Sequence, residues 1–237
     1  ADKALAEDAS RHDLREELCI TVDPADAKDF DDAVGARKLE DGSFELWVHI
    51  ADVAHYVKWD SPIDLEARIR TCSAYLVDRV LPMLPEKLCN DVCSLRPAED
   101  RLAMSVKMKL SNSGKILGAT AMNSVIRSRA RLSYDQVDSY LQGDATALDS
   151  AVPREDTGAI KEMINVLNQI RALREEIREK RGSVDFESVE TRVVLDQDNK
   201  PTGVSVRERT QATGLIEEAM LAANESVAHM LSQHDLE

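Results

Sequence analysis

The sequence is poor in several residue types that mark particular classes of protein. Among 237 residues there are nine glycines, seven prolines and only 4% aromatic residues, which excludes collagen-like and low-complexity chains. No apolar run approaches the roughly eighteen residues that a membrane-spanning helix needs. The first eight residues, Ala-Asp-Lys-Ala-Leu-Ala-Glu-Asp, lack the basic and apolar stretches of a secretory signal. We therefore expect a cytoplasmic protein with no membrane partner.

Cysteine is also scarce. Four cysteines, Cys19, Cys72, Cys89 and Cys93, are too few and too irregularly spaced for a disulfide framework in a chain of this length. No second pair and no nearby histidine accompanies Cys89 and Cys93 to complete a zinc site. The composition favours reduced, mostly buried thiols.

Acidic residues outnumber basic ones, 44 to 30, and 43% of the residues are hydrophobic. Such a chain is globular, and its net charge of −14 by itself argues against a polyanionic partner. Residues 96–131, however, hold eight lysines and arginines against only Glu99 and Asp100. This segment either lines a path for phosphates or forms the solvated face of a two-stranded ribbon.

Alternating apolar residues predict several β-strands. Residues 19–22 form a short β-prone run that Asp23-Pro24 ends, and residues 44–50 follow an Asp-Gly turn. Strict alternation over 102–110, followed by Ser-Asn-Ser-Gly, predicts a long antiparallel hairpin from residue 101 to about 129.

Apolar residues at intervals of three and four predict helices over 160–177 and 216–230, with a weaker candidate over 65–74. Two short β-like runs surround Val193 and Val204. Residues 1–17 are interpreted as a linker or a short entry helix. The pattern indicates one α/β (α+β) domain in which a mixed, largely antiparallel sheet packs against amphipathic helices.

Five aspartates follow the first predicted strand within ten residues: Asp23, Asp26, Asp29, Asp31 and Asp32. Carboxylates this close repel one another and tend to take up protons unless a strong positive charge lies among them. Hard oxygen ligands select magnesium or manganese, and two such ions can support cleavage of a phosphodiester.

The alternative is an aspartate-rich surface turn, since aspartate is common in turns and at helix starts. A surface turn does not require the apolar Phe30 between Asp29 and Asp31, nor a β-prone run before it. A calcium loop does not fit either, because the glycine at its sixth position is missing.

Residues 23–33, Asp-Pro-Ala-Asp-Ala-Lys-Asp-Phe-Asp-Asp-Ala, resemble the signature of the ribonuclease II and ribonuclease R family, the hydrolytic 3′-to-5′ exoribonucleases. Further blocks resemble the family in the same order: 48–57, 75–88, 93–96, 100–104, 181–186 and 216–224. The resemblance implies an RNB-type catalytic domain over residues 18–237. It also implies hydrolysis of single-stranded RNA from the 3′ end to nucleoside 5′-monophosphates.

By this resemblance, four aspartates are the active-site carboxylates. Asp23, Asp29 and Asp32 are expected mainly to position Mg²⁺, with Mn²⁺ as a possible substitute, and Asp31 is expected to be tied most closely to the chemical step as well as to the metal. Asp26 is not among the family's recurring four, and we interpret it as a turn residue or a helper of the ligands.

The resemblance also implies three RNA-binding residues. Tyr75 and Phe186 correspond to aromatics that clamp the last bases by stacking, a contact that tolerates any base. Glu218 corresponds to a residue near the 3′-terminal nucleotide. From composition alone, core aromatics and a glutamate on a helix face remain the alternatives.

One family motif is missing: Thr-Ser-Pro-Ile-Arg-Arg, whose arginine holds the phosphate, does not occur. Cold-shock and S1-type RNA-binding modules do not occur either. We therefore expect the front part of a catalytic domain, incomplete at its C-terminal side, from a parent with flanking RNA-binding modules. Whether this part is active or inactive alone stays open. A non-catalytic relative that binds RNA or protein and a metal-dependent phosphatase remain alternatives, and the oligomeric state stays open.

Overall fold

The computed structural model describes residues 10–183, 190–196, 200–207 and 209–233. Its main sheet has the strand order β1-β8-β7-β4-β3-β2-β9. Neighbouring strands are antiparallel except at the two edges, where β1 pairs with β8 and β2 with β9 in parallel. The strands are β1 (His12–Leu14), β2 (Ile20–Asp23), β3 (Asp32–Lys38), β4 (Phe44–Ala51), β7 (Asp100–Leu110), β8 (Ile116–Arg127) and β9 (Ala130–Ser133).

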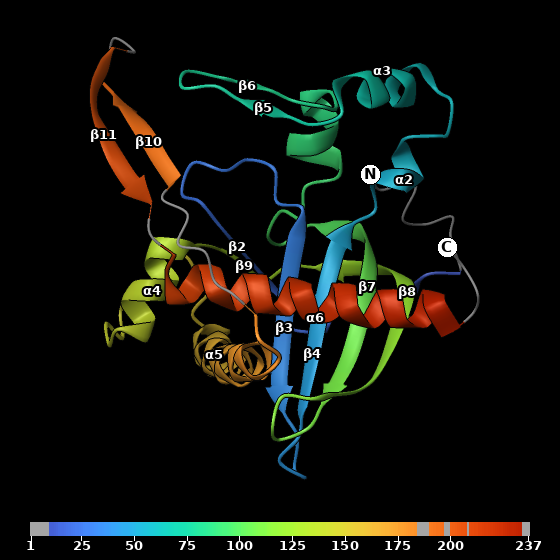
Figure 1. Cartoon of the computed structure of the whole chain (residues 1–237), viewed down its shortest axis with the longest axis vertical. Helices are drawn as coiled ribbons and strands as arrows, with labels where there is room; N and C mark the ends of the chain where they lie inside the picture. The colour runs from blue at the N-terminus through green and yellow to red at the C-terminus, as the bar shows by residue number, and fades with distance from the viewer. Residues whose placement is uncertain (1–9, 184–189, 197–199, 208, 234–237) are drawn as a thin grey trace.

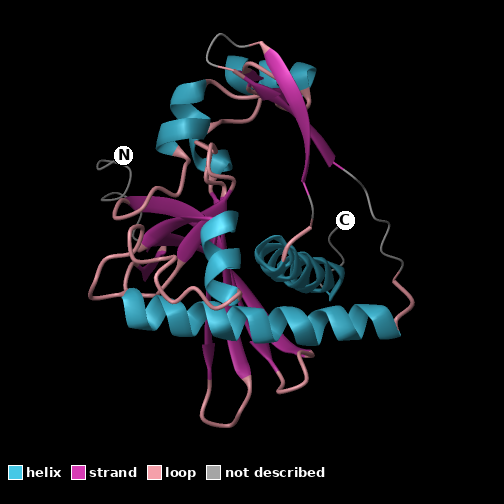
Figure 2. Ribbon diagram, turned by 90° about the vertical axis from the view of Figure 1, so that its left-hand side faces the viewer, coloured by secondary structure: helices cyan, strands magenta, loops and turns pink. Residues whose placement is uncertain are grey.

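Helices cover one face of this sheet. Figure 1 shows α6 (Gln211–Gln233) lying across the strands, and Figure 2 shows α5 (Thr157–Lys180) crossing α6. The short α4 (Tyr134–Leu141) follows β9 and begins with a capping box between Ser133 and Gln136. The core lies between the helices and the sheet, and includes Ile20, Val34, Leu46, Val48, Val106, Met108, Ile160, Ile164, Leu167, Leu215 and Ala219.

A group of short elements connects β4 to β7 and lies beyond one end of the sheet (Figure 1). It comprises α2 (Val53–Tyr56), α3 (Pro62–Arg70), the hairpin of β5 (Ala74–Tyr75) with β6 (Val80–Leu81), and the π-helical turn η1 (Leu88–Val92). A second hairpin, of β10 (Glu190–Leu195) with β11 (Pro201–Arg207), precedes α6.

The sequence expectations for the fold are confirmed in their main points. The sheet is mixed and mostly antiparallel, the long hairpin is formed by β7 and β8, and both long helices are present. The weak candidate over 65–74 is a helix that ends earlier, at Arg70, because Thr71 takes a positive φ of 63°. Part of the expected entry segment, His12–Leu14, joins the sheet as β1.

The four cysteines are free thiols. Cys19 and Cys93 are buried, whereas Cys72 is exposed and Cys89 is intermediate, so only half of them fit the expectation of buried thiols. Within the described parts of the chain, no helix is both long enough and apolar enough to cross a bilayer.

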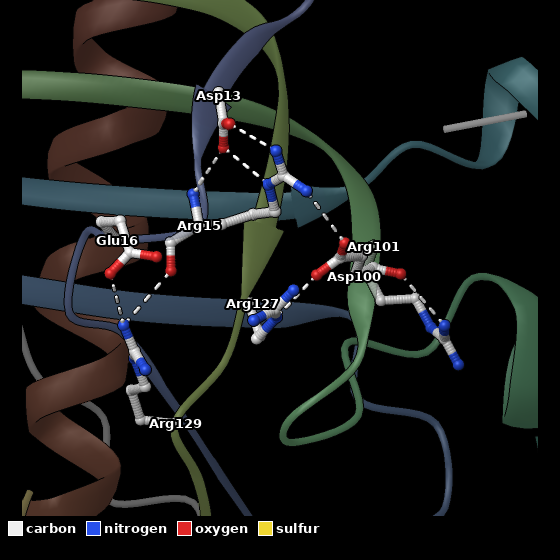
Figure 3. A network of polar contacts seen from close by, with 7 residues as sticks. All are labelled: Asp13, Arg15, Glu16, Asp100, Arg101, Arg127 and Arg129. Atoms are coloured by element: carbon white, nitrogen blue, oxygen red, sulfur yellow. Dashed lines mark hydrogen bonds and ion pairs between the residues drawn. The ribbon is translucent and has the colours of Figure 1, made fainter. Parts of the chain in front are cut away.

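Most basic side chains of segment 96–131 are paired with carboxylates, several of which come from other parts of the chain. Figure 3 shows Arg127 paired with Asp100 at 2.6 Å and Arg129 with Glu16 at 3.3 Å. Lys107 and Lys109 pair with Glu45 and Asp41 at 2.9 and 3.0 Å. The structure therefore favours an ion-paired face of the sheet over a path for phosphates.

Candidate active site

The sheet topology brings the aspartates of the sequence motif to one end of two neighbouring strands. Asp23 ends β2 and Asp32 begins β3, and these strands are antiparallel neighbours. The end of one strand and the start of the next therefore lie side by side. Residues 24–31, which we call the aspartate loop, join these two strand ends and include Asp29 and Asp31.

The charges of these carboxyl groups act on one another, and burial adds to the effect. Burial, with the charges of Asp32 and Asp29 adding to it, raises the pKa of Asp23 to about 7. Burial and the charge of Asp31 raise the pKa of Asp32 to about 6. Burial and the charge of Asp29 raise the pKa of Asp31. A cation among the four would relieve this repulsion.

The donor set fits a divalent cation. Asp23 is only 8% exposed, and its Oδ2 is buried without a hydrogen-bond partner, so one hard oxygen is available as a ligand. Within the described ranges, no three His, Cys, Asp or Glu side chains lie close enough together to hold a metal ion. Ligation by three aspartates therefore requires at least one of their side chains to rotate.

Tyr75 lies beside the aspartate loop although 46 residues separate it from Asp29. The hairpin of β5 and β6 extends over this end of the sheet (Figure 1), and Tyr75 Oη donates a hydrogen bond of 3.2 Å to Asp29 Oδ2. The ring is 68% exposed, so it is not the core aromatic that composition alone favours. Its face is available to a ligand that reaches the loop.

The other two expected RNA-binding residues are placed differently. Glu218 is fully buried on α6 and forms an ion pair of 2.6 Å with Arg178 of α5. In this structure it therefore stabilises the contact between the two helices. Phe186 lies outside the described residues.

Two further residues contact the aspartate loop, although neither was among the individual site residues expected from the sequence. Arg131 of β9 donates to the carbonyl oxygens of Pro24 and Ala25 at 2.8 and 2.7 Å, and its charge lowers the pKa of Asp23. Ser94 also contacts the loop: its Oγ accepts a hydrogen bond from the backbone N–H of Phe30. Only the block 93–96, which resembles the family, pointed to Ser94. Asp26, by contrast, is exposed on the turn.

Comparisons with known proteins agree with this geometry. A family model described as the RNB domain matches residues 11–237. Ribonuclease R 1 of Lactococcus lactis is 41% identical over 226 residues, which cover 95% of this chain and 27% of that protein. The chain thus spans about a quarter of the length of this curated relative.

Solved structures show the same fold. Mycoplasma genitalium RNase R in complex with ribose-methylated single-stranded RNA has a TM-score of 0.89 at 34% identity, over 99% of this chain and 35% of that one. Yeast Ssd1, a pseudonuclease, shares the fold alone, with a TM-score of 0.72 at 18% identity over 98% of this chain and 27% of that one. With a family match over nearly all of its length and the aspartate motif at the adjoining ends of β2 and β3, the chain belongs to the RNB-domain family.

Proposed function

We propose that this chain is the catalytic part of a magnesium-dependent 3′-to-5′ exoribonuclease that hydrolyses single-stranded RNA to nucleoside 5′-monophosphates. The observation that carries the proposal is the convergence of Asp23, Asp29, Asp31 and Asp32 at the end of β2, where burial and mutual repulsion raise the pKa of three of them. The similarity to proteins named ribonuclease R supports the substrate class and the reaction.

The roles of the residues follow from their positions. Asp23, Asp29 and Asp32 would hold Mg²⁺ or Mn²⁺ together with Asp31. When bound, these ions would supply the positive charge that activates a water and stabilises the leaving oxygen. The hydroxyl of Tyr75 donates a hydrogen bond to Asp29. Its exposed ring would stack on a base near the 3′ end of the RNA. Asp31 lies at the end of the loop, next to Asp32, and would take the most direct part in the chemical step, as the family resemblance implies.

The test is release of mononucleotides from a single-stranded RNA with a 3′ tail, in the presence of Mg²⁺ or Mn²⁺ and with a chelator as control. Asp31→Asn is expected to abolish release while the affinity for RNA stays nearly unchanged, because the variant removes chemistry rather than a binding surface. Chromatography of the products and a filter-binding assay measure the two quantities. Equal loss of binding and activity would contradict this role of Asp31.

The same assay separates the rival functions. A non-catalytic relative, of the kind that shares this fold in yeast Ssd1, would bind RNA without releasing mononucleotides in either metal. A metal-dependent phosphatase would hydrolyse a chromogenic phosphate ester and leave the RNA intact. Either result would overturn the proposed function.

A further inference from the structure

The aspartate loop has little regular structure of its own. Apart from a turn at residues 25 and 26, it contains neither helix nor strand. It nevertheless has to hold Asp29 and Asp31 in a fixed relation to Asp23 and Asp32, which belong to strands. The backbone groups next to Asp29 and Asp31 are hydrogen-bonded to residues outside the loop.

Ser94 makes two of these bonds. Its side chain is fully buried, and Oγ accepts a hydrogen bond of 3.0 Å from the backbone N–H of Phe30. The same hydroxyl donates to the carbonyl oxygen of Lys28 at 3.3 Å. These are the residues immediately before and after Asp29, so one hydroxyl fixes the backbone on both sides of this carboxylate.

The neighbouring backbone continues the attachment toward Asp31. The N–H of Leu95 donates to the carbonyl oxygen of Phe30 at 2.8 Å, and the N–H of Ala51 donates to the carbonyl oxygen of Asp31 at 2.9 Å. Ala51 ends β4. The second half of the loop is thus held by the segment around Ser94 on one side and by the sheet on the other.

Ser94 is itself held in place by the sheet. Arg101 of β7, which is 5% exposed, donates from Nε to the carbonyl oxygen of Ser94 at 2.8 Å. The Arg101 guanidinium also forms an ion pair with Glu99. It donates as well to the carbonyl oxygen of Asp100, at 3.1 Å (Figure 3). A chain of contacts therefore leads from a strand, through Ser94, to the backbone that carries Asp29.

We propose that Ser94 is a positioning residue for the cation ligands of the site: its hydroxyl sets the direction in which Asp29 and Asp31 leave the backbone. The proposal rests on the proposed function, because it concerns the same carboxylates. Removal of the hydroxyl leaves the N–H of Phe30 without this acceptor and lets the loop shift. Mutation of a residue that orients metal ligands by hydrogen bonds typically lowers metal affinity or activity 10–100-fold.

The experiment compares the wild-type chain with Ser94→Ala, Ser94→Thr and Ser226→Ala. Threonine keeps the hydroxyl and serves as the rescue variant. Ser226 is the matched control, because it is also buried and its Oγ donates to a backbone carbonyl, that of Ala222 in α6. Two quantities are measured: Mn²⁺ affinity by calorimetry or electron paramagnetic resonance, and hydrogen exchange of the amides at residues 28–31.

We expect Ser94→Ala to weaken Mn²⁺ binding by about 10–100-fold and to speed exchange at Phe30. Ser94→Thr is expected to keep most of the Mn²⁺ affinity and most of the protection from exchange at Phe30. Ser226→Ala is expected to change neither the affinity nor the exchange. In RNA hydrolysis, Ser94→Ala should lower kcat more than it changes KM for RNA.

Unchanged Mn²⁺ affinity or unchanged exchange at Phe30 in Ser94→Ala overturns the proposal, as does an equal effect of Ser226→Ala, which would indicate general destabilisation. A wild-type chain that binds no Mn²⁺ refutes the proposed function and this proposal with it. Binding by the wild type together with unaltered binding by Ser94→Ala refutes the positioning role alone.

Discussion

At the scale of single residues, Tyr75 combines an exposed ring with a hydrogen bond to the aspartate loop. If the ring stacks on a base, Tyr75→Ala should change the length of the final undigested RNA, because stacking contributes about 1–3 kcal/mol per base. Tyr75→Phe keeps the ring and loses only the bond to Asp29, so its end product should match the wild type. Gel analysis of limit digests measures this. An end product unchanged in Tyr75→Ala would contradict the stacking role.

His49 is a buried histidine on β4 that the proposed reaction does not use. Its Nδ1 lies 2.6 Å from Ser105 Oγ, which lies 2.5 Å from Ser124 Oγ, and Ser124 donates to the carbonyl oxygen of Ala103. Since each serine has one proton, this chain of bonds requires the proton on Nδ1. Nε2 is buried without a hydrogen-bond partner, so protonation there would bury a charge.

Burial accordingly lowers the pKa of His49 to about 4. The unfolded chain takes up the proton near pH 6.5 and the folded chain does not, so stability falls as pH drops from 6.5 toward 4. Between pH 7.5 and 5 the loss should be about 2 kcal/mol. The aspartates with raised pKa values, Asp23, Asp31 and Asp32, act in the opposite direction.

Urea unfolding of the wild type and of His49→Gln at both pH values isolates the histidine, because the aspartates titrate alike in the two chains. The difference in unfolding free energy between them should shrink by about 2 kcal/mol at pH 5. A difference independent of pH would show that His49 takes up its proton as readily in the folded chain as in the unfolded one, which contradicts the lowered pKa.

At the scale of elements, β3 depends on a close approach that only glycine permits. A Cβ on Gly35 would lie 2.3 Å from the backbone oxygen of Leu18, far inside contact distance, and neither backbone segment can move without disturbing the sheet. Gly35→Ala should therefore destabilise the chain by about 3 kcal/mol. Gly118→Ala on β8, where nothing lies within 4 Å of the new Cβ, is the control. Equal unfolding midpoints in urea would contradict this account of β3.

At the scale of the whole molecule, the repulsion within the aspartate cluster predicts stabilisation by divalent cations. At a Mg²⁺ or Mn²⁺ concentration 100 times Kd, binding adds about 2.7 kcal/mol to the free energy of unfolding, which should raise Tm by about 5–10 °C in a chain of this size. A chelator should reverse the shift. Differential scanning calorimetry at pH 8 measures it.

Two variants make this measurement specific. Asp23→Asn should lose the shift caused by the cation, while its own metal-free stability rises because a repelling charge has gone. Asp26→Asn should keep the shift, since the charge of Asp26 is not among those that raise the pKa of the other aspartates. Stabilisation that persists in Asp23→Asn would place the cation elsewhere.

The sequence by itself determined the elements whose pattern is long and regular. The alternation over 102–110 specifies β7, and the three- and four-residue spacing over 160–177 and 216–230 specifies α5 and α6. The sequence also identified the aspartate cluster, because five carboxylates within ten residues are visible in the sequence itself.

Tertiary structure decided what depends on distant segments. β3 lacks a strong alternating pattern and becomes a strand because it lies between β2 and β4. The folded chain brings Ser94 against Phe30 and Tyr75 against Asp29. It also pairs the basic segment with remote carboxylates. Glu218 is buried against Arg178 for the same reason. Sequence patterns indicate which face of a helix or strand a residue lies on. Which distant residue it contacts is determined by the packing of the whole chain.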